Sequence, residues 1–466
     1  MQIEIKNICC VGAGYVGGPT MAVIAKMCPH LQINVVDVNE QRISEWNSEN
    51  LEELPIFEPG LDKIVHECRD KNLHFSTDIK KQIAEADMVF ISVNTPTKTK
   101  GIGAGKASDL KWVEACARQV ATFSVGYTIV VEKSTLPVRT AEVIKSILQA
   151  SQNSGNVEKT FDVLSNPEFL AEGSAIEDLI NPDRVLIGGE NEKAIDALSA
   201  IYSNWVSENK ILRTNIWSSE LAKLTANAFL AQRISSINSI SALCEATGAD
   251  VREVARAIGS DKRIGSKFLS SGPGFGGSCF KKDILNLVYL SEYFGLPEVA
   301  NFWEGVVNLN NWHQHRISQL VVKKLFGTVS CKKISILGFA FKANTNDTRE
   351  SAAITICKDL LEEGAILSIH DPKVEDEQIS KDLKFNSSNL DQEGSWKMSK
   401  NIYESINGSD AIIVLTEWKE YTKINWQKVS KITRNPAWVF DSRSILKSEE
   451  VKAAGLKLWR IGDGLN

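Results

Sequence analysis

The chain has 466 residues, of which 43% are hydrophobic and 24% are charged, and its formal net charge is −5. This length exceeds what one hydrophobic core usually supports, because domains typically contain about 100–200 residues, so two or three domains are expected. The composition is that of a folded globular protein and not of a disordered chain. The acidic balance, without a dense Lys/Arg stretch, argues against a nucleic-acid partner.

The sequence lacks the usual marks of export, membrane insertion or metal binding. The opening stretch MQIEIKNICCVGAG runs from an acidic residue directly into an apolar strand and a glycine-rich turn, unlike a cleaved signal. No apolar run approaches the roughly 18 residues that a membrane-spanning helix needs. The nine cysteines form no C-x-x-C pair, and His313 and His315 stand two apart in a helical pattern and so point to different faces. We therefore expect a cytoplasmic protein with reduced thiols, no membrane association and no metal.

Between residues 6 and 189, short apolar runs alternate with amphipathic stretches. The apolar runs are NICCVGAG, INVVDV, MVFISVN, YTIVVEKS, FDVLSNPE and RVLIGG. This rhythm is typical of a parallel sheet with crossover helices. It predicts a Rossmann-like domain over residues 1–215.

The middle of the chain is predicted to be helical. A proline-free helical pattern covers residues 218–248, opened by Ser218 and Ser219 and closed by Thr247 and Gly248, as helix caps would do. Residues 250–325 are also mostly helical in pattern, interrupted by the loop SSGPGFGGS. We predict a central helical linker over residues 216–328.

The C-terminal part resembles a weak repeat of the first domain. KKISILGFAFK is similar to KNICCVGAGYVG, AILSIHDPKV to LQINVVDVNE, and GSDAIIVLTEW to EADMVFISVNTP. A second doubly wound domain is therefore predicted over residues 329–466, with the polar segment 388–400 as a surface loop. The expected fold class is α/β, with two doubly wound Rossmann-like domains joined by a long central helix and a helical segment.

A dinucleotide-binding signature occupies the first strand, turn and helix. Gly12, Gly14 and Gly17 follow the G-x-G-x-x-G spacing, which permits the tight turn, the approach of backbone to pyrophosphate and close helix packing. Asp37 ends the next apolar strand, where a carboxylate can bind the ribose hydroxyls and repel a 2′-phosphate. The pattern indicates NAD and not NADP, the alternative being a tight turn beside an exposed acid. Arg42 either covers the adenine or is a solvated helix charge.

Cys279 ends the glycine-rich stretch GPGFGGS and begins a helical pattern. At a helix N-terminus the dipole and the free N–H groups favour a thiolate and stabilise an oxyanion on a carbonyl that it attacks. Asp283 lies four residues on, which places it on the same helix face, where it can position water or an ammonium group. We interpret Cys279 as a nucleophile. A packing role is instead assigned to Cys9, Cys10, Cys116, Cys244 and Cys357.

Two further groups are weaker candidates for catalysis. Lys223 and Asn227 stand four apart on the predicted long helix and could stabilise a developing alkoxide, although a lysine with a buried stem and a solvated ammonium group is the simpler interpretation. Glu168, Glu172 and Thr135 follow predicted strands, where a carboxylate could act as a general base through an oriented water. Taken singly, each glutamate is better explained as a cap or a surface residue.

The C-terminal domain replaces the dinucleotide glycines with bulky residues in Gly338-Phe-Ala-Phe-Lys342. NAD binding there is therefore not assumed. Lys342, Arg349 and Arg443 could instead supply the positive charge that a nucleoside diphosphate requires, or could be ordinary solvated basic residues.

Taken together, GAGYVG, VNTPT, EKSTLPV, NPEFLAEG, ELAKLTANAFLAQRISSIN, RIGSKFL, GFGGSCFKKD and LGFAFKANTNDTRES resemble the UDP-glucose 6-dehydrogenase family from end to end and in order. The resemblance implies NAD-dependent oxidation of a UDP-sugar alcohol to an acid through a thioester on the cysteine. The implied catalytic residues are Cys279, Lys223, Asn227, Asp283, Glu168, Glu172 and Thr135. The central domain would carry dimerisation as well as the cysteine loop, in a homo-oligomer that is a dimer or a hexamer built of dimers.

The resemblance also implies ligand contacts. Those to NAD would come from Gly12, Gly14, Tyr15, Val16, Gly17, Asp37, Arg42, Val93, Thr95, Ser134, Thr135, Glu172, Cys279, Lys282 and Arg349. Those to UDP-glucose would come from Glu168, Phe169, Leu170, Lys223, Asn227, Lys267, Phe268, Leu269, Phe275, Gly276, Phe280, Phe341, Lys342 and Arg443, with Arg263 reaching the substrate of a neighbouring subunit.

The chain departs from the family pattern at two places. Ala343-Asn344 stands where family members carry a Lys-Asp pair, and a basic residue is missing at Ala104. Neither position belongs to the implied catalytic set, so the departures bear only on regulation, including feedback by UDP-xylose. Two other functions stay open: a sister enzyme acting on a UDP-N-acetylhexosamine or GDP-mannose, and an inactive dinucleotide-binding sensor. A sensor would have no need of Cys279, Lys223, Asn227 and Asp283 together.

Overall fold

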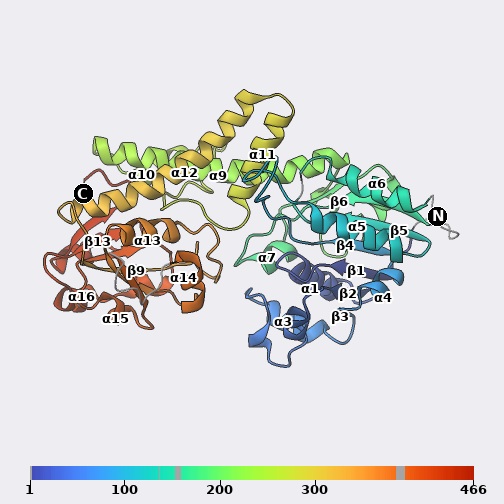
Figure 1. Ribbon diagram of the computed structural model, residues 1–466, viewed down its shortest axis with the longest axis horizontal. Coiled ribbons are helices and arrows are strands. Elements are labelled where there is room, and N and C mark those ends of the chain that lie inside the picture. The colour runs from blue at the N-terminus through green and yellow to red at the C-terminus, as the bar shows by residue number, and fades with distance from the viewer. Residues whose placement is uncertain (1–2, 136, 153–158, 385–393, 466) are drawn as a thin grey trace. The chain divides into compact units, whose positions relative to one another are not determined.

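The computed structural model describes residues 3–135, 137–152, 159–384 and 394–465. The chain divides into two compact units, each with its own sheet (Figure 1). The first unit comprises Met1–Ala226 and Leu285–Phe294, and the second comprises Asn227–Ile284 and Gly295–Asn466. The three-domain division into 1–215, 216–328 and 329–466 stays a prediction.

The sheet of the first unit has the doubly wound arrangement that the apolar runs predict. Its strands are β1 (Asn7–Val11), β2 (Gln32–Val36), β3 (Leu73–Ser76), β4 (Met88–Ile91), β5 (Tyr127–Glu132), β6 (Thr160–Ser165), β7 (Val185–Gly188) and β8 (Ile211–Thr214). Their order is β3-β2-β1-β4-β5-β6-β7-β8. The part from β3 to β6 is parallel and has the strand order of a dinucleotide-binding domain.

Helices cover both faces of this sheet. They are α1 (Gly17–Met27), α2 (Glu40–Trp46), α3 (Leu61–Cys68), α4 (Ile79–Ala84), α5 (Lys111–Phe123), α6 (Thr140–Gln152), α7 (Ala175–Ile180) and α8 (Glu192–Tyr202). Along β1, Ile8 and Cys10 pack with α1, α3, α7 and α8, whereas Cys9 and Val11 pack with α4, α5 and α6. Successive strand residues point to opposite faces, so adjacent cysteines belong to different cores. The packing role predicted for Cys9 and Cys10 is confirmed.

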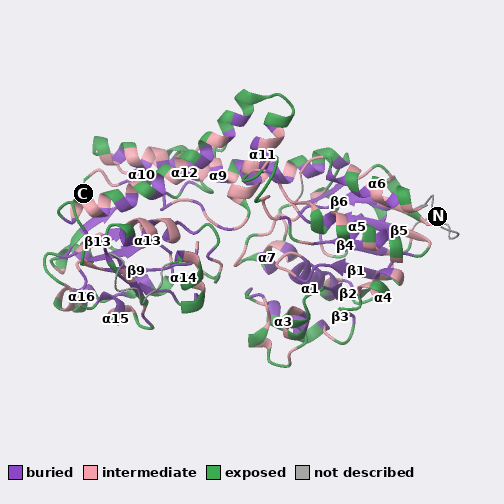
Figure 2. Cartoon of the chain, in the orientation of Figure 1, coloured by how far each residue is buried: buried purple, intermediate pink, exposed green. Residues whose placement is uncertain are grey.

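The second unit repeats this topology. Its strands are β9 (Lys333–Leu337), β10 (Ile366–His370), β11 (Ser395–Met398), β12 (Ala411–Val414), β13 (Trp438–Asp441) and β14 (Lys457–Arg460). They are parallel, in the order β11-β10-β9-β12-β13-β14, which corresponds strand for strand to β3-β2-β1-β4-β5-β6. Figure 2 shows the buried interior along the middle strands of each sheet. The predicted second doubly wound domain is confirmed.

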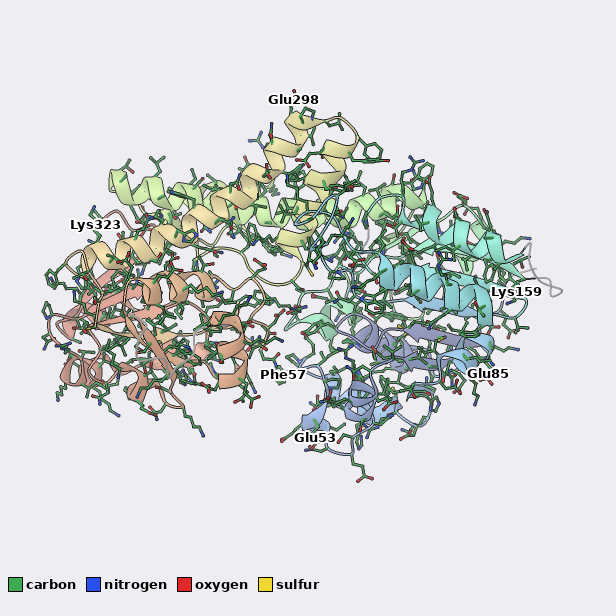
Figure 3. The ribbon with its side chains drawn as sticks, viewed as in Figure 1. Glu53, Phe57, Glu85, Lys159, Glu298 and Lys323 are labelled. Carbon is green, nitrogen blue, oxygen red and sulfur yellow. The ribbon has the colours of Figure 1, made fainter. Side chains whose placement is uncertain are left out.

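Long helices occupy the middle of the sequence. The remaining helices are α9 (Ile216–Thr247), α10 (Val251–Gly259), α11 (Phe280–Tyr293), α12 (Pro297–Lys324), α13 (Ala352–Glu362), α14 (Asp376–Leu383), α15 (Ile402–Ile406), α16 (Trp426–Ile432) and α17 (Ser448–Ala453). Glu298 and Lys323 mark the two ends of α12 (Figure 3), so an acid lies in its first turn and bases in its last, as the helix dipole favours. In the described part of the chain, no helix has an apolar stretch of the length that a bilayer requires.

The cap predicted for the long helix is wrong at its start. α9 begins at Ile216, and the side chain of Asn215 accepts a hydrogen bond of 2.8 Å from Ser218 N. Asn215 is therefore the capping residue in place of Ser218 and Ser219. The signal was present, because asparagine is as good a cap as serine. At the other end Gly248 adopts a φ of +82°, as a glycine that ends a helix does.

Two other differences concern strands at or near sheet edges. RVLIGG forms β7, but β7 pairs antiparallel with β6 at Ser165 and Gly188, because apolar alternation reports burial and not strand direction. The segment 388–400, predicted as a loop, lies partly outside the described residues, and its Ser395–Met398 part forms β11. Like β3 and β8, β11 is an edge strand. Edge strands are short and half-solvated, so they lack the apolar run that marks central strands.

The two sheets share one device in the turn after the first strand. Gly12 has a φ of +111° and donates to Val36 O at 2.8 Å, and Gly338 has a φ of +97° and donates to His370 O at 2.8 Å. In the second unit Asp371, directly after β10, holds this turn. Its carboxylate accepts hydrogen bonds from the backbone N–H groups of Phe339, Ala340, Lys373 and Val374 and from the indole of Trp418.

We predict that Asp371→Asn lowers the free energy of unfolding of the second unit by about 3 kcal/mol, because a neutral amide accepts fewer hydrogen bonds and turns an N–H toward buried N–H donors. Calorimetric unfolding of the variant measures the loss. Glu362→Gln, an exposed acid at the end of α13, is the matched control and should stay within about 0.5 kcal/mol. A loss below about 1 kcal/mol in Asp371→Asn would contradict the role given to Asp371.

Candidate functional site

The glycine turn of the first unit leaves room for a ligand on one side only. A side chain at Gly12 would meet Ser92 O at 2.3 Å, and one at Gly17 would meet Gly12 O at 2.0 Å. A side chain at Gly14 would meet nothing within 4 Å. From behind, the indole of Trp46 donates to Ala13 O at 3.0 Å. The backbone at Gly14 is therefore open, as a site for pyrophosphate requires.

Asp37 lies beside this turn at the end of β2 and is 9% exposed. Its carboxylate accepts from Ala13 N and Asn39 N, both at 2.9 Å, and contacts Arg42 Nη1 at 3.2 Å. An acid held in this place suits the hydroxyls of an adenosine ribose. The turn and Asp37 together fit NAD. Arg42 forms an ion pair with Asp37, and its predicted place over the adenine stays a prediction.

A buried acid connects the turn to the loop after β6. Glu58 accepts hydrogen bonds from the Tyr15 hydroxyl, from Gly173 N and, at 3.0 Å, from Ala175 N at the start of α7. Burial and the neighbouring Glu58 raise the pKa of Tyr15, so the phenol stays a hydrogen-bond donor. Val16 precedes α1, and Glu172 lies half-buried in the same loop as Gly173. Tyr15, Val16 and Glu172, which were predicted to contact the cofactor, therefore lie in the two segments that Glu58 holds.

The ends of β4 and β5 also come together. Ser134 Oγ donates to Val93 O at 2.7 Å, and Thr95 Oγ1 donates to Thr135 O at 3.1 Å. These four residues were predicted separately from VNTPT and EKSTLPV. Because both strands are parallel neighbours, their carboxyl ends meet at one edge of the sheet, where α/β proteins bind ligands.

Glu168 is held by a buried network. Its Oε2 lies 2.8 Å from Lys133 Nζ, and its Oε1 accepts from Phe169 N at 2.8 Å and Leu170 N at 3.1 Å. Lys133 also donates to Asn166 at 3.1 Å. Burial opposes the charge on both partners, but their attraction prevails: the pKa of Glu168 is lowered and that of Lys133 is raised. Glu168 is therefore an ionised carboxylate with a fixed position.

Two cations lie over the face of Phe169. Arg184 is 3.9 Å from the ring centroid, and Lys223 Nζ is 5.2 Å from it. Lys223 is buried and also lowers the pKa of Glu168, as the least of several causes. The structure thus brings Lys223, Phe169, Leu170 and Glu168 together in the first unit.

The second unit holds Cys279 at the start of α11. Asp283 N donates to Cys279 O at 2.9 Å, which places the two side chains one helical turn apart. The buried Asp283 carboxylate accepts from Asn227 Nδ2 at 2.6 Å and lies 3.7 Å from Lys282 Nζ. Cys279 itself is exposed. Asn227, Asp283, Lys282 and Cys279 therefore form one local group, whereas Lys223 and Glu168 belong to the first unit.

The cysteine loop packs against the turn after β9. A side chain at Gly276 would meet Glu350 O at 2.6 Å and Phe341 Cβ at 2.9 Å, and Gly277 N donates to Arg349 O at 2.8 Å. The guanidinium of Arg349 points to Asp347, with Nη2 2.7 Å from Oδ2. Phe275 and Phe280 form an edge-to-face pair at 6.1 Å. Only glycine permits this close approach of the two backbones.

Arg443 joins the same region. Its guanidinium donates to Phe341 O at 2.9 Å and to Leu415 O at 2.8 Å, and it contacts Glu417 at 3.1 Å. Lys342 Nζ lies 5.5 Å from the Phe341 ring. Five of the residues predicted to contact the substrate are thus assembled here, namely Phe275, Gly276, Phe341, Lys342 and Arg443.

The RIGSKFL loop is organised by one arginine of α9. Arg233 donates to Ile264 O at 2.9 Å, to Gly265 O at 2.7 Å and to Lys267 O at 3.0 Å. Phe268 is exposed with a φ of +62°. Leu269 packs against Ile237, Cys244 and Val251. The Arg263 side chain is 89% exposed and pairs with Asp261.

The sequence pattern does not mark several residues that hold these groups, namely Glu58, Lys133, Arg233, Asn238 and Asn310, and it marks His313 only as part of a helical pattern. His313 is buried and its Nε2 lies 2.9 Å from Gly272 O, whereas His315 pairs with Asp359. Among the described residues, no cluster of three or more His, Cys, Asp or Glu side chains is suited to a metal ion. For Arg233, Asn238, Asn310 and His313 the only signal was a polar residue within a helical pattern, which does not indicate which loop the side chain contacts. Glu58 and Lys133 lie outside helices, and their segments gave no such signal.

The chain is similar to known proteins over its whole length. The UDP-glucose/GDP-mannose dehydrogenase family matches it in three parts: the NAD binding domain at residues 6–206, the central domain at 217–312 and the UDP binding domain at 335–448. UDP-glucose 6-dehydrogenase of Gallus gallus is 56% identical and covers 99% of this chain, which covers 94% of that protein.

Two solved structures have the same fold. A UDP-glucose dehydrogenase from Pyrobaculum islandicum matches 99% of this chain and 98% of its own with a TM-score of 0.83 and 29% identity. A UDP-D-ManNAc dehydrogenase from Pyrococcus horikoshii matches 98% of this chain and 99% of its own with a TM-score of 0.80 and 25% identity. From these matches and the site described above, the chain belongs to the UDP-glucose/GDP-mannose dehydrogenase family.

Proposed function

We propose that the chain oxidises UDP-glucose to UDP-glucuronate with NAD. The observation that carries this proposal is the 56% identity to a UDP-glucose 6-dehydrogenase, which extends over nearly the full length of both chains. Cys279, Asn227 and Asp283 are present and assembled in the second unit, which argues against the alternative of an inactive sensor.

Each unit would bind its ligand with the groups already described. The open backbone at Gly14 would bind the pyrophosphate of NAD and Asp37 the ribose hydroxyls, with Val93, Thr95, Ser134 and Thr135 along the strand ends. In the second unit, Lys342 and Arg443 would bind the diphosphate of the nucleotide sugar. NAD, when bound, accepts the hydride that leaves C6 in each of two oxidations.

Cys279 would supply the covalent chemistry. After the first oxidation its sulfur adds to the C6 aldehyde carbon. A C–S bond forms, and the carbonyl oxygen becomes the oxyanion of a hemithioacetal. After the second oxidation the same carbon is a thioester. Water then adds to that carbon, the C–S bond breaks, and the thiolate returns as the acid leaves. Backbone N–H groups at the start of α11 are suited to stabilise the oxyanion.

The carboxylates would orient water and accept protons. Asp283, fixed by Asn227 and near Lys282, is placed one turn from the sulfur and would orient water or an ammonium group. Glu168 would act as the general base of thioester hydrolysis, with Glu172 and Thr135 assisting, and Lys223 would stabilise the alkoxide of the first oxidation. Because the pKa of Glu168 is lowered, the base would remain ionised well into the acidic range.

The choice of sugar is the point on which a sister enzyme differs. The Pyrococcus horikoshii structure, a UDP-D-ManNAc dehydrogenase, has a TM-score of 0.80 with this chain, so the fold does not separate the two substrates. The higher sequence identity to the glucose enzyme favours glucose. Titration with UDP-glucose, UDP-N-acetylmannosamine and GDP-mannose, followed by NADH absorbance, tests the choice.

We further propose a cytoplasmic homo-oligomer, a dimer or a hexamer built of dimers, in which Arg263 reaches the substrate of a neighbouring subunit. The nine cysteines are all free thiols, which agrees with a reducing compartment. The Arg263 side chain is 89% exposed, which leaves it available to a second copy of the chain. Light scattering of the purified protein tests the assembly.

Asp37→Ser should relax the preference for NAD, because it removes the carboxylate that repels a 2′-phosphate and leaves the guanidinium of Arg42 to attract one. The ratio of kcat/KM for NAD to that for NADP should fall by at least about tenfold. Adding Arg42→Ala should reverse part of the gain with NADP. An unchanged ratio in Asp37→Ser would show that another residue selects the cofactor.

Lys342→Ala should raise KM for UDP-glucose by at least about tenfold and leave KM for NAD nearly unchanged, because the substrate and the cofactor are assigned to different units. Arg443→Ala should do the same, with a further loss of stability because Arg443 also holds Phe341. Lys381→Ala, an exposed lysine on α14, is the control. Equal effects on the KM values for both ligands would contradict the division. A loss of substrate binding no larger than about 0–1 kcal/mol, which is what an exposed ion pair contributes, would also contradict it.

Wild type should form two NADH for each UDP-glucuronate, because oxidation of an alcohol to an acid removes four electrons. In Cys279→Ala no C–S bond can form, so at most one NADH per substrate should appear and little acid should accumulate. The rate of acid formation should fall by about three orders of magnitude or more. If purified Cys279→Ala still produces acid with two NADH at a near wild-type rate, Cys279 is only a packed thiol.

A further inference from the structure

The loop that carries Cys279 is held by side chains of two long helices. Residues 270–277 form no helix or strand. Yet Gly272 and Phe275 each have both backbone groups, the N–H and the C=O, bonded to a side chain of α9 or α12. A buried backbone group needs a partner, and here each partner comes from outside the loop.

At Gly272 the partners are Asn238 of α9 and His313 of α12. Gly272 N donates to Asn238 Oδ1 at 3.0 Å, and His313 Nε2 lies 2.9 Å from Gly272 O. A carbonyl can only accept, so Nε2 must carry a proton. Burial and the nearby Arg316 lower the pKa of His313 to about 4, so at neutral pH the imidazole is neutral and is the Nε2–H tautomer. Both side chains are buried.

At Phe275 a single residue of α12 makes both contacts. Phe275 N donates to Asn310 Oδ1 at 2.8 Å, and Asn310 Nδ2 donates to Phe275 O at 3.2 Å. The amide thus replaces the neighbouring strand that this residue lacks. Gly274 makes the approach possible, because a side chain there would meet Asn310 Oδ1 at 2.9 Å. Asn310 is 4% exposed, so solvent offers little substitute for these bonds.

This arrangement leaves little freedom to the nucleophile. Between Phe275 and the start of α11 at Phe280 lie four residues, and one of them, Gly277, donates to Arg349 O at 2.8 Å. The chain is therefore fixed before, within and after the segment that carries Cys279. A displacement of about 1 Å at a reacting atom can cost about a hundredfold in rate.

We propose that Asn310, together with Asn238 and His313, positions Cys279 for attack on the aldehyde. This inference rests on the proposed function, in which Cys279 is the nucleophile. None of the three side chains needs to touch the substrate, so each is a positioning residue. The first oxidation uses no sulfur and would depend on them only through the substrate contacts of the loop, whereas capture of the aldehyde would depend on them directly.

The two steps can be separated by their products. When Cys279 is displaced, the aldehyde is captured more slowly and part of it leaves after one oxidation, with one NADH and no acid. The ratio of NADH to UDP-glucuronate then rises above two. A variant that is merely less stable loses active enzyme but keeps the ratio at two, because each folded molecule still completes both oxidations.

The first test compares Asn310→Ala with Asn308→Ala, the same change at an exposed position of the same helix. NADH is followed by absorbance, acid by chromatography, and escaped aldehyde is trapped with a hydroxylamine reagent. Asn310→Ala should form acid at least about tenfold more slowly, with trapped aldehyde and a ratio above two, and KM for NAD should change by less than about twofold. Asn308→Ala should match wild type.

The second test uses His313, in case Asn310→Ala does not fold. His313→Gln retains an N–H donor at a similar reach to Nε2, whereas His313→Leu removes it. His313→Leu should release aldehyde, and His313→Gln should restore the ratio toward two. The proposal is overturned if the ratio stays at two in folded Asn310→Ala and His313→Leu, or if His313→Gln and His313→Leu are equally impaired. If wild type itself makes no acid with two NADH, the proposed function fails instead.

Discussion

The structure depends on how the backbone N–H groups of tight turns are satisfied where a strand ends. After β1 and β9 the chain turns so sharply that its amides cannot pair with a neighbouring strand, and an aspartate at the end of the next strand accepts them. Asp37 does so for Ala13, and Asp371 for Phe339 and Ala340. A carboxylate is suited to this because it accepts several charge-assisted bonds at once.

The same device has different outcomes in the two sheets. In the first unit the turn stays open at Gly14, and Asp37 keeps some exposure, so both remain available to a cofactor. In the second unit Phe339 and Ala340, which stand where the first unit has Ala13 and Gly14, are buried, and the Asp371 carboxylate accepts hydrogen bonds from both of their backbone N–H groups. One topology therefore supports a dinucleotide site in the first sheet and a rigid platform for Phe341, Lys342 and Arg443 in the second.

Buried polar side chains fix the irregular segments. Lys133 and Glu168 form an ion pair with side chains only 3% and 14% exposed, and Arg233 holds three carbonyls of the RIGSKFL loop. Such pairs add little net stability, since desolvation offsets much of their attraction. Their effect is to select one conformation of a loop that has few apolar contacts of its own. Long helices serve well as the source of these groups because they are rigid.

The sequence by itself determined the features that depend on local pattern: the central strands, the long helix, the glycine turn with Asp37, and Cys279 one turn before Asp283. Apolar periodicity and glycine spacing are properties of neighbouring residues, so they can be read directly. Only the tertiary structure decided the edge strands β3, β8 and β11, the antiparallel direction of β7, and the partners of the loops. The segments around Asn310, His313 and Arg233 do not indicate which carbonyl each side chain will contact. Each contact joins residues tens of positions apart and forms only after the helices and loops have packed.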